Sequence, residues 1–292
     1  MVLPNAVPVR DHAPNRRGQR RDHPVSRDER AMGDPDVTRP NSARMYDYFL
    51  GGAQNFAVDR EAADQASVAF PHIQVGARVN RSFLGRAVTY LVQHGVDQFL
   101  DLGSGIPTVG NVHEIAHRHN PTARVAYVDY EPVAVAHARR LLADNPLVSI
   151  TQADIRRPEN VLAAPGVCEV LDFSRPVAVL AMAILHFLPD DDDPYGMLAS
   201  YRDACAPGSY LAISHGSQVT LSDKQIKEFL EAYARTPTPA LFRSVEQIRP
   251  LLAGYELVPP GLVLLPQWHP NVPVSDAEAA ESNIYGAIGL LP

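Results

Sequence analysis

Apolar residues recur along the chain with two different spacings. Spacings of three and four predict amphipathic helices over 59–68 and 77–94. Short apolar runs of strand length follow, bounded by turn residues and separated by segments long enough for helices. The five predicted strands are 98–102, 124–128, 147–150, 177–183 and 210–214, and helices are predicted between the first three of them at 108–119 and 133–142.

The pattern changes near the C-terminus. Strands that alternate with helix-length segments pair in parallel and carry helices on both faces. After a predicted helix over 244–252, however, two short apolar segments at 255–258 and 262–265 are joined by the turn residues 259–261. This spacing predicts an antiparallel hairpin. The expected fold is therefore an α/β, doubly wound, seven-stranded, mostly parallel sheet with a C-terminal antiparallel hairpin.

The N-terminal segment has a different composition. Residues 1–38 contain several Pro and many Arg but almost no periodic apolar residues, which predicts a disordered tail. Its arginines could contact an acidic partner, or the tail could be a solvated extension. We expect residues 39–292 to form one domain in which 39–95 are an N-terminal helical cover.

Composition narrows the class of protein. The chain has 292 residues, 46% hydrophobic and 20% charged, which suits a globular protein with a sizeable core. A net charge of −7 argues against nucleic acid as a bulk partner. Cys168 and Cys205 are too far apart in sequence for a thiolate metal site of their own. No apolar run approaches the roughly 20 residues needed to span a bilayer, and the N-terminus lacks the apolar core of a signal peptide, so we expect a cytoplasmic protein without a membrane partner. The oligomeric state stays open.

A small-residue turn follows the first strand. Gly103, Ser104 and Gly105 let the backbone approach a ligand closely, and a helix beyond them would offer free amides. This predicts a nucleotide or nucleoside cofactor. A dinucleotide fingerprint would need a third glycine where Thr108 stands, and Pro107 stiffens the turn. Together with the hairpin, these departures favour S-adenosylmethionine over NAD, with an NAD-dependent oxidoreductase as the alternative.

Acidic residues follow the predicted parallel strands. Asp101 lies inside the first, Asp129 follows the second and Asp154 follows the third. Ligands of open α/β sheets bind at the carboxyl ends of the strands, so these side chains should line one crevice. Asp129, about 24 residues after Gly105, is placed to accept hydrogen bonds from ribose hydroxyls, or else to cap the helix near residue 132. Asp154 could meet an adenine amino group.

The predicted cover contains an aromatic segment. Residues 41–52 carry Tyr46, Tyr48 and Phe49 on a short capped helix. These rings could close over a cofactor, or they could pack the segment onto the domain. Asn80, near the start of the second long helix, is a further candidate to reach the cofactor.

Two motifs suggest a metal at first sight. The run from His113 to His117 has the H-E-x-x-H pattern of zinc proteases. Its helix directly follows the glycine turn, however, and is expected to face the cofactor and the sheet. The run Asp190–Asp193 could hold a divalent cation, or it could satisfy the amides of a helix N-terminus. We expect no metal at either.

Several blocks resemble one family. They are 101–108 with 111–114, 46–52 with 55–56, and 172–177, and they resemble an S-adenosylmethionine-dependent methyltransferase family once catalogued only as a domain of unknown function; 184–190 also resembles a segment of many class I methyltransferases. The resemblance covers about residues 38–270. It implies a class I, Rossmann-like methyltransferase fold. It also implies that Gly103, Ser104 and Gly105 cradle the cofactor, with Asp129 on the ribose, Asp154 and Ile155 at the adenine, and Ala183 near the methionyl part. Tyr130, Tyr46 and Asn80 complete the predicted cofactor-binding set.

The acceptor cannot be named from these residues, but a small molecule is expected. Methyl transfer from a sulfonium is an in-line displacement, so alignment and exclusion of water supply much of the catalysis. A base is needed only for a protonated acceptor, and His186, His215 and Asp47 are candidates. Each histidine could instead be a buried, hydrogen-bonded core residue. A cofactor-binding protein without catalysis is the third alternative.

Overall fold

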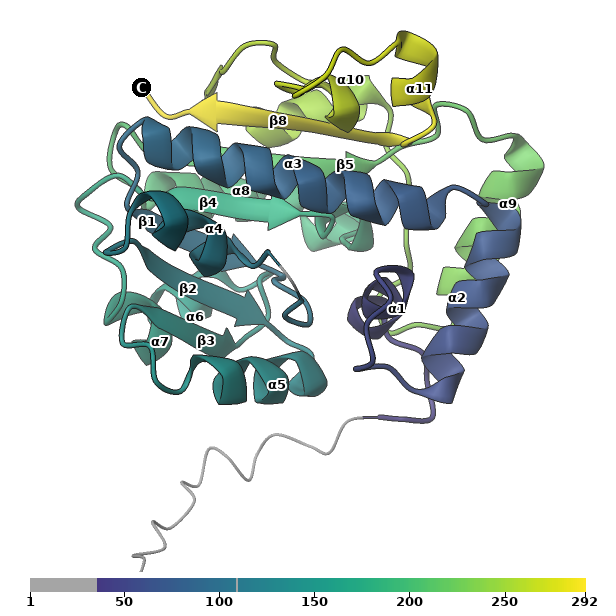
Figure 1. Cartoon of the computed structure of the whole chain (residues 1–292), viewed down its shortest axis with the longest axis horizontal. Coiled ribbons are helices and arrows are strands. Elements are labelled where there is room, and N and C mark those ends of the chain that lie inside the picture. The colour runs from purple at the N-terminus through teal and green to yellow at the C-terminus, as the bar shows by residue number, and fades with distance from the viewer. Residues whose placement is uncertain (1–35, 109) are drawn as a thin grey trace, which may run out of the picture. The chain divides into compact units, whose positions relative to one another are not determined.

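The computed structural model describes residues 36–108 and 110–292, and within them eight strands form one sheet (Figure 1). The strands are β1 (Gln98–Leu102), β2 (Arg124–Asp129), β3 (Val148–Gln152), β4 (Ala178–Met182), β5 (Tyr210–Gly216), β6 (Glu256–Leu257), β7 (Val263–Leu264) and β8 (Ile284–Leu290). Their order is β3-β2-β1-β4-β5-β8-β6, and β7 also pairs with β8. Strands β1 to β5 are parallel, which confirms the predicted doubly wound α/β class.

Helices cover both faces of the sheet (Figure 1). The α-helices are α1 (Ser42–Phe49), α2 (Ala57–Ala69), α3 (Ile73–Gln93), α4 (Val112–His119), α5 (Pro132–Leu142), α6 (Pro158–Leu162), α7 (Pro165–Cys168), α8 (Pro194–Asp203), α9 (Asp223–Tyr233), α10 (Val245–Ile248) and α11 (Asp276–Ala280). The 3-10 turns are η1 (Leu185–Phe187), η2 (Asp190–Asp192), η3 (Arg249–Leu252) and η4 (Leu265–Gln267).

Side chains of the central strands alternate between two cores. Phe99 packs in the core formed with α3, α4 and α5, whereas Leu100 and Leu102 pack in the core formed with α6, α7, α8 and α10. Successive side chains of a strand point to opposite faces, so a strand buried on both faces is apolar at nearly every position. This explains why the runs of β1, β2 and β4 were recognisable in the sequence.

Two predicted helices differ in the structure. The helix expected from residue 108 begins at Val112, because the Glu114 carboxylate accepts hydrogen bonds from the amides of Gly110 and Asn111 and fixes the helix start there. The helix expected over 244–252 is divided into α10 and the 3-10 turn η3. Pro250 lacks the amide that an α-helix needs at that position, which accounts for the change.

The predicted C-terminal hairpin was wrong in its pairing. β6 and β7 do not pair with each other; both pair antiparallel with β8, a strand that the sequence pattern did not reveal. β8 also pairs antiparallel with β5 and so joins them to the sheet. Gly286 and Gly289 interrupt its apolar pattern, yet a Cβ at either would lie 2.4 Å from Leu265 or 2.6 Å from Tyr255. The glycines mark close packing inside this strand.

A third core lies beyond the carboxyl ends of the parallel strands. It joins α1, α2 and α9, which we call the cap, through buried residues such as Phe49, Ala66 and Phe229. In Figure 1 the arrowheads of the parallel strands point towards α1, with α2 and α9 beyond it. Of the expected cover at 39–95, α1 and α2 lie in the cap, whereas most buried residues of α3 pack against the sheet. The cap also contains α9, a helix inserted between β5 and β6 that the sequence analysis missed.

The predicted tail, 1–38, lies outside the described residues except for its last three. Among the residues that are described, no helix is long and apolar enough to cross a membrane.

A buried arginine fastens the cap to the sheet. The Arg44 side chain is 2% exposed, and its guanidinium donates to Asp59 and Glu131, each over 2.8 Å. Its remaining nitrogen donates to the carbonyl oxygens of Asp36 and Arg39. Asp59 belongs to α2, while Glu131 stands two residues beyond the end of β2, at the start of α5. The ion pairs thus connect two cap helices to the strand end beside the glycine turn.

Replacing this arginine should be costly. Arg44→Met keeps much of the volume but leaves two buried carboxylates without their cation, so the free energy of unfolding should fall by about 3–5 kcal/mol. Urea unfolding at pH 7 measures the loss. Arg60→Met is the matched control, since Arg60 is exposed on α2 and should change stability by no more than about 0.5 kcal/mol. Equal losses in the two variants would contradict the anchoring role of Arg44.

Candidate functional site

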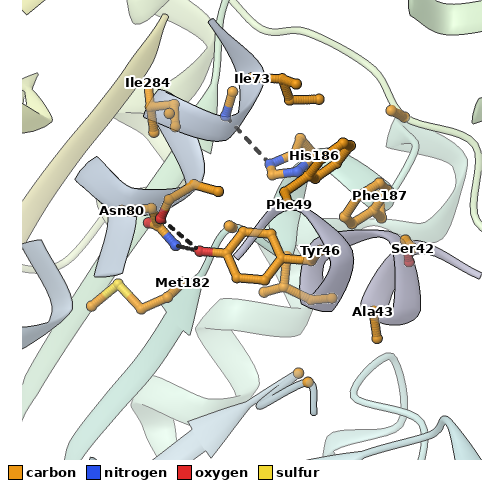
Figure 2. A pocket seen from close by; sticks show the side chains of 18 of the residues that line it. Ser42, Ala43, Tyr46, Phe49, Ile73, Asn80, Met182, His186, Phe187 and Ile284 are labelled. Atoms are coloured by element: carbon orange, nitrogen blue, oxygen red, sulfur yellow. Dashed lines mark hydrogen bonds between the residues drawn. The ribbon is translucent and has the colours of Figure 1, made fainter. Parts of the chain in front are cut away.

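A pocket opens at the carboxyl ends of β1, β2, β4 and β5, beneath the cap (Figure 2). Eight of the ten predicted cofactor residues line it: Tyr46, Asn80, Gly103, Ser104, Gly105, Asp129, Tyr130 and Ala183. Of the three candidate bases, only His186 does so. The structure thus brings together residues that are up to about 140 positions apart in the chain.

The glycine turn is held against the end of β2. The amides of Gly103 and Ser104 both donate to the carbonyl of Val128, over 2.8 and 3.1 Å. Gly103 and Gly105 have φ of +69° and +67°, a region in which side chains are strained. A Cβ at Gly103 would lie 2.5 Å from Ile184, whereas nothing lies within 4 Å of one at Gly105. The open space beside Gly105 is where a ligand could approach the backbone.

The helix beyond the turn offers fewer free amides than expected. α4 begins at Val112, and Glu114 already occupies the amides of Gly110 and Asn111. Ligand binding here must therefore rely mainly on the turn itself rather than on the N-terminus of α4.

Asp129 connects the turn to the second strand. One of its carboxylate oxygens accepts from the Gly105 amide over 2.6 Å, and the other accepts from the Glu131 amide over 2.9 Å. The second bond fits the helix-cap alternative, because Glu131 stands at the start of α5. Burial raises the pKa of this carboxyl. Asp129 still lines the pocket, so the capping and ribose-binding roles are compatible.

Asp101 is a second buried acid in the pocket. Burial raises its pKa to about 7, nearby Arg81 counteracts the shift, and Asp129 adds to it. Arg81, on α3, also lines the pocket and donates to the carbonyl of Gly110 over 2.6 Å. The carboxyl of Asp101 is therefore poised between its two protonation states near neutral pH.

Asp154 and Ile155 do not line this pocket. The Asp154 carboxylate pairs with Arg156 over 2.7 Å, and Arg156 also reaches Asp192 over 3.1 Å. Ile155 is buried, and its carbonyl accepts from the Tyr201 hydroxyl. Their adenine role stays a prediction.

Gln152 is a candidate that the sequence analysis missed. It ends β3 and stands in register with Asp129. Its amide nitrogen donates to the carbonyl of Tyr130, while its buried Oε1 has no hydrogen-bond partner. Gln152 does not itself line the pocket, but it lies next to Asp129 and Tyr130, which do. A buried acceptor without a partner at this place suits a donor on a bound molecule. Only the strand register reveals this, since glutamine after an apolar run carries no signal of its own.

A chain of hydrogen bonds couples the cap to the strand ends. The Ala183 amide donates to the Ser214 hydroxyl, which donates to the Asn80 side-chain oxygen over 2.6 Å. The Asn80 nitrogen donates to the Tyr46 hydroxyl over 2.9 Å, and that hydroxyl donates to the carbonyl of Ala77 (Figure 2). Ala183 has φ of +53°, an uncommon conformation for alanine. Ser214, which the sequence analysis did not single out, holds it in place.

His186 faces the pocket as a neutral ring. Its Nδ1 accepts from the Gly216 amide over 3.3 Å, so in the neutral form the proton is on Nε2. Burial, with His215 and Arg243 nearby, lowers its pKa to about 3. His186 can therefore donate a hydrogen bond at neutral pH but is a poor proton acceptor.

The other two candidate bases have structural roles. His215 is fully buried: its Nδ1 donates to the carbonyl of Gly216, and its Nε2 accepts from Arg243 over 3.0 Å. Burial lowers its pKa to about 4. Asp47 is 2% exposed and accepts from the Gln54 amide and the Asn55 side chain, each over 2.8 Å. Neither lines the pocket, so the geometry does not favour them as bases.

The two metal-like motifs have other partners. His113 bonds the Tyr127 hydroxyl, Glu114 caps α4, and His117 bonds the carbonyl of Ala123. In the acidic run, Asp190 pairs with Arg243, Asp192 with Arg156, and Asp193 accepts from the Gly196 amide at the start of α8. Over residues 36–108 and 110–292, no group of three or more His, Cys, Asp or Glu side chains could hold a metal ion.

Known proteins share both the sequence and the fold. A structure from Thermobifida fusca YX, described as that of a methyltransferase, is 39% identical, covers 88% of this chain and 96% of its own, and superposes with a TM-score of 0.83. A DUF574 family protein from Streptomyces avermitilis MA-4680 is 37% identical. The match covers 88% of this chain and 99% of that protein's chain, and the TM-score is again 0.83. No protein with a curated function matches the chain.

A family model described as S-adenosyl methyltransferase matches residues 28–292. This match decides against the dehydrogenase alternative that the glycine turn had left open. The chain belongs to the S-adenosyl methyltransferase family and is an S-adenosylmethionine-dependent methyltransferase with a class I fold.

Proposed function

We propose that this enzyme methylates a small molecule that binds beneath the cap, beside a cofactor held at the glycine turn. The observation that carries the proposal is one continuous pocket that runs from Gly103 and Gly105 to the rings of α1 and α9. The cap lies over the acceptor end, which favours a small molecule over a protein or a nucleic acid.

The residues of the turn and of the strand ends suit S-adenosylmethionine. The space beside Gly105 admits a ligand against the backbone, and the orphaned Oε1 of Gln152 could accept from an adenine amino group. We assign the ribose to Asp129 and Tyr130, and the methionyl part to the region of Ala183 and Asn80. Gly103 and Ser104 shape the turn, and Asp154 and Ile155 remain proposed for the far side of the adenine.

The bound cofactor supplies a methyl group on a positively charged sulfur. The protein's task is to align the acceptor and to exclude water. The hydrogen-bond chain from Ala183 to Tyr46 fixes the two sides of the pocket relative to each other, and the apolar cap keeps water out.

Calorimetry tests the cofactor assignment. S-adenosylmethionine and S-adenosylhomocysteine should both bind the purified protein, and NAD should not. Gly103→Ala should weaken S-adenosylhomocysteine binding by at least about tenfold, because the added Cβ collides with Ile184 in a strained backbone. The matched control is Gly85→Ala on α3, where a Cβ meets nothing within 4 Å. A folded protein that binds neither adenosyl compound would refute the assignment.

Asp101 predicts a pH dependence of stability. Because its pKa is raised to about 7 in the folded protein, its contribution to stability is fully present below about pH 4 and is lost as the pH rises through 7. Asp101→Asn lacks this loss, so the variant should gain stability relative to the parent as the pH rises from about 4 to about 7, and the gain should stay constant above pH 7. The gain is at most on the order of 4 kcal/mol. Urea unfolding of the ligand-free proteins across this range measures it.

The same carboxyl should influence cofactor affinity. S-adenosylmethionine is cationic, and ionised Asp101 favours a cation nearby, so affinity should fall below pH 7 in the parent but not in Asp101→Asn. Asp97→Asn, at the other end of β1, is the control; Asp97 pairs with Arg175 at the surface, outside the pocket, so its replacement should leave the pH profile of cofactor affinity as in the parent. Parallel pH profiles for the parent and Asp101→Asn would overturn the role of Asp101.

A further inference from the structure

The two ends of the pocket differ in chemistry. Its charged lining residues, Arg81, Asp101 and Asp129, gather around the glycine turn and the end of β2. Under the cap, the described lining residues carry no charged side chain. A buried ammonium would have no carboxylate there, and a buried carboxylate or phosphate would have no cation. Because an unpaired buried charge is costly, this end selects against ionic acceptors.

Aromatic rings form one wall of the acceptor end. Phe187 lies 5.7 Å from Tyr233, Tyr233 lies 4.8 Å from Phe229, and Phe229 lies 5.1 Å from Phe242, measured between ring centroids. Each pair is inclined by only 33° or 34°. We call these four rings the aromatic wall. The four tilted rings line the pocket as one apolar aromatic surface, against which a flat, apolar ligand can pack.

At the acceptor end, two hydrogen-bond donors of the described lining residues lack protein partners. The Nε2–H of His186 is one, since its Nδ1 takes the Gly216 amide. The Tyr233 hydroxyl is the other; in the part of the chain that is described it makes no hydrogen bond, although Tyr233 is only 5% exposed. Other polar groups nearby are satisfied, as the Tyr46 and Asn80 bonds illustrate. Unpaired donors beside an apolar wall call for an oxygen on the ligand.

Resting on the proposed function, we propose that the methyl acceptor is a planar aromatic hydroxy compound without ionic substituents, bound against the aromatic wall and methylated on its oxygen. His186 and Tyr233 hold that oxygen. On transfer, the acceptor oxygen forms the new O–CH3 bond, the S–CH3 bond breaks with its electron pair left on sulfur, and the hydroxyl proton leaves to water. His186 does not take this proton, because its Nδ1 is occupied and its Nε2 is already protonated.

The test uses calorimetry to compare the binding of probes that share the naphthalene ring to protein saturated with S-adenosylhomocysteine. The probes are 2-naphthol, naphthalene, 6-hydroxy-2-naphthoic acid and 6-(aminomethyl)-2-naphthol. We expect 2-naphthol to bind at least about tenfold more tightly than either charged probe. It should also yield 2-methoxynaphthalene with S-adenosylmethionine, detected by mass spectrometry.

Two variants locate the binding. Tyr233→Phe removes one oxygen and keeps the ring. It should therefore lower the affinity for 2-naphthol about five- to tenfold and leave the affinity for naphthalene unchanged. Phe187→Leu should lower the affinity for both 2-naphthol and naphthalene. The control is Phe173→Leu, a half-buried phenylalanine before the amino end of β4, outside the pocket, which should change neither. Unchanged S-adenosylhomocysteine affinity shows that each variant is folded.

The outcomes separate the two proposals. If the folded parent protein does not bind S-adenosylhomocysteine, the proposed function is overturned. Retained S-adenosylhomocysteine binding with equal or tighter binding of a charged probe would overturn only the acceptor class. Equal effects of Tyr233→Phe on 2-naphthol and naphthalene would remove the hydroxyl from the acceptor contacts, and with it the argument for an oxygen acceptor.

Discussion

The ion pairs of Arg44 decide where the cap lies. A buried guanidinium, here 2% exposed, is costly to the folded protein unless carboxylates pair with it, and Asp59 and Glu131 belong to different parts of the fold. All three charged side chains must be present together, because removing any one of them leaves a buried charge without compensation. Glu131 stands two residues beyond Asp129, whose carboxylate holds the glycine turn. The cap position and the shape of the cofactor end are thus set by neighbouring residues of one strand end.

The second link between cap and sheet is neutral. Asn80 uses its side-chain oxygen on Ser214 and its nitrogen on Tyr46, so this one side chain fixes both walls of the pocket. Ser214 in turn holds Ala183 in its uncommon conformation. Satisfied groups of this kind position the walls, whereas the unsatisfied ones, on Gln152, His186 and Tyr233, remain to meet bound molecules. This division separates residues that build the pocket from those proposed to contact its contents.

The sequence was informative where a structural requirement is local. β1, β2 and β4 are buried on both faces, so each is an apolar run whatever its neighbours. The glycine turn and the acids after the strands were recognisable because their backbone roles restrict residue type. β8 was missed because Gly286 and Gly289 interrupt its apolar pattern. Glycine is needed there because the side chains of Leu265 and Tyr255, which are distant in sequence, leave no room for a Cβ. α9 was missed for a related reason: its place in the cap depends on packing against α2.

The candidate bases illustrate the same limit. His186 and His215 lie close to predicted strand ends, and their spacing alone could not distinguish a base from a buried hydrogen-bonded ring. Arg243, more than 25 residues away in sequence, makes the difference. It donates to His215 and to the carbonyls of Leu185 and Leu188, pairs with Asp190, and helps to keep both rings neutral.

A neutral, donating His186 changes how catalysis must work. The described residues under the cap then offer donors to an oxygen but no group that readily takes its proton. Such a site favours acceptors that lose a proton to water without help, and aromatic hydroxyls do so far more readily than aliphatic ones. Donors also stabilise the oxyanion once it forms. The protein's contribution then lies in stacking, alignment and dryness, which are the properties that the cap and its two anchoring networks provide.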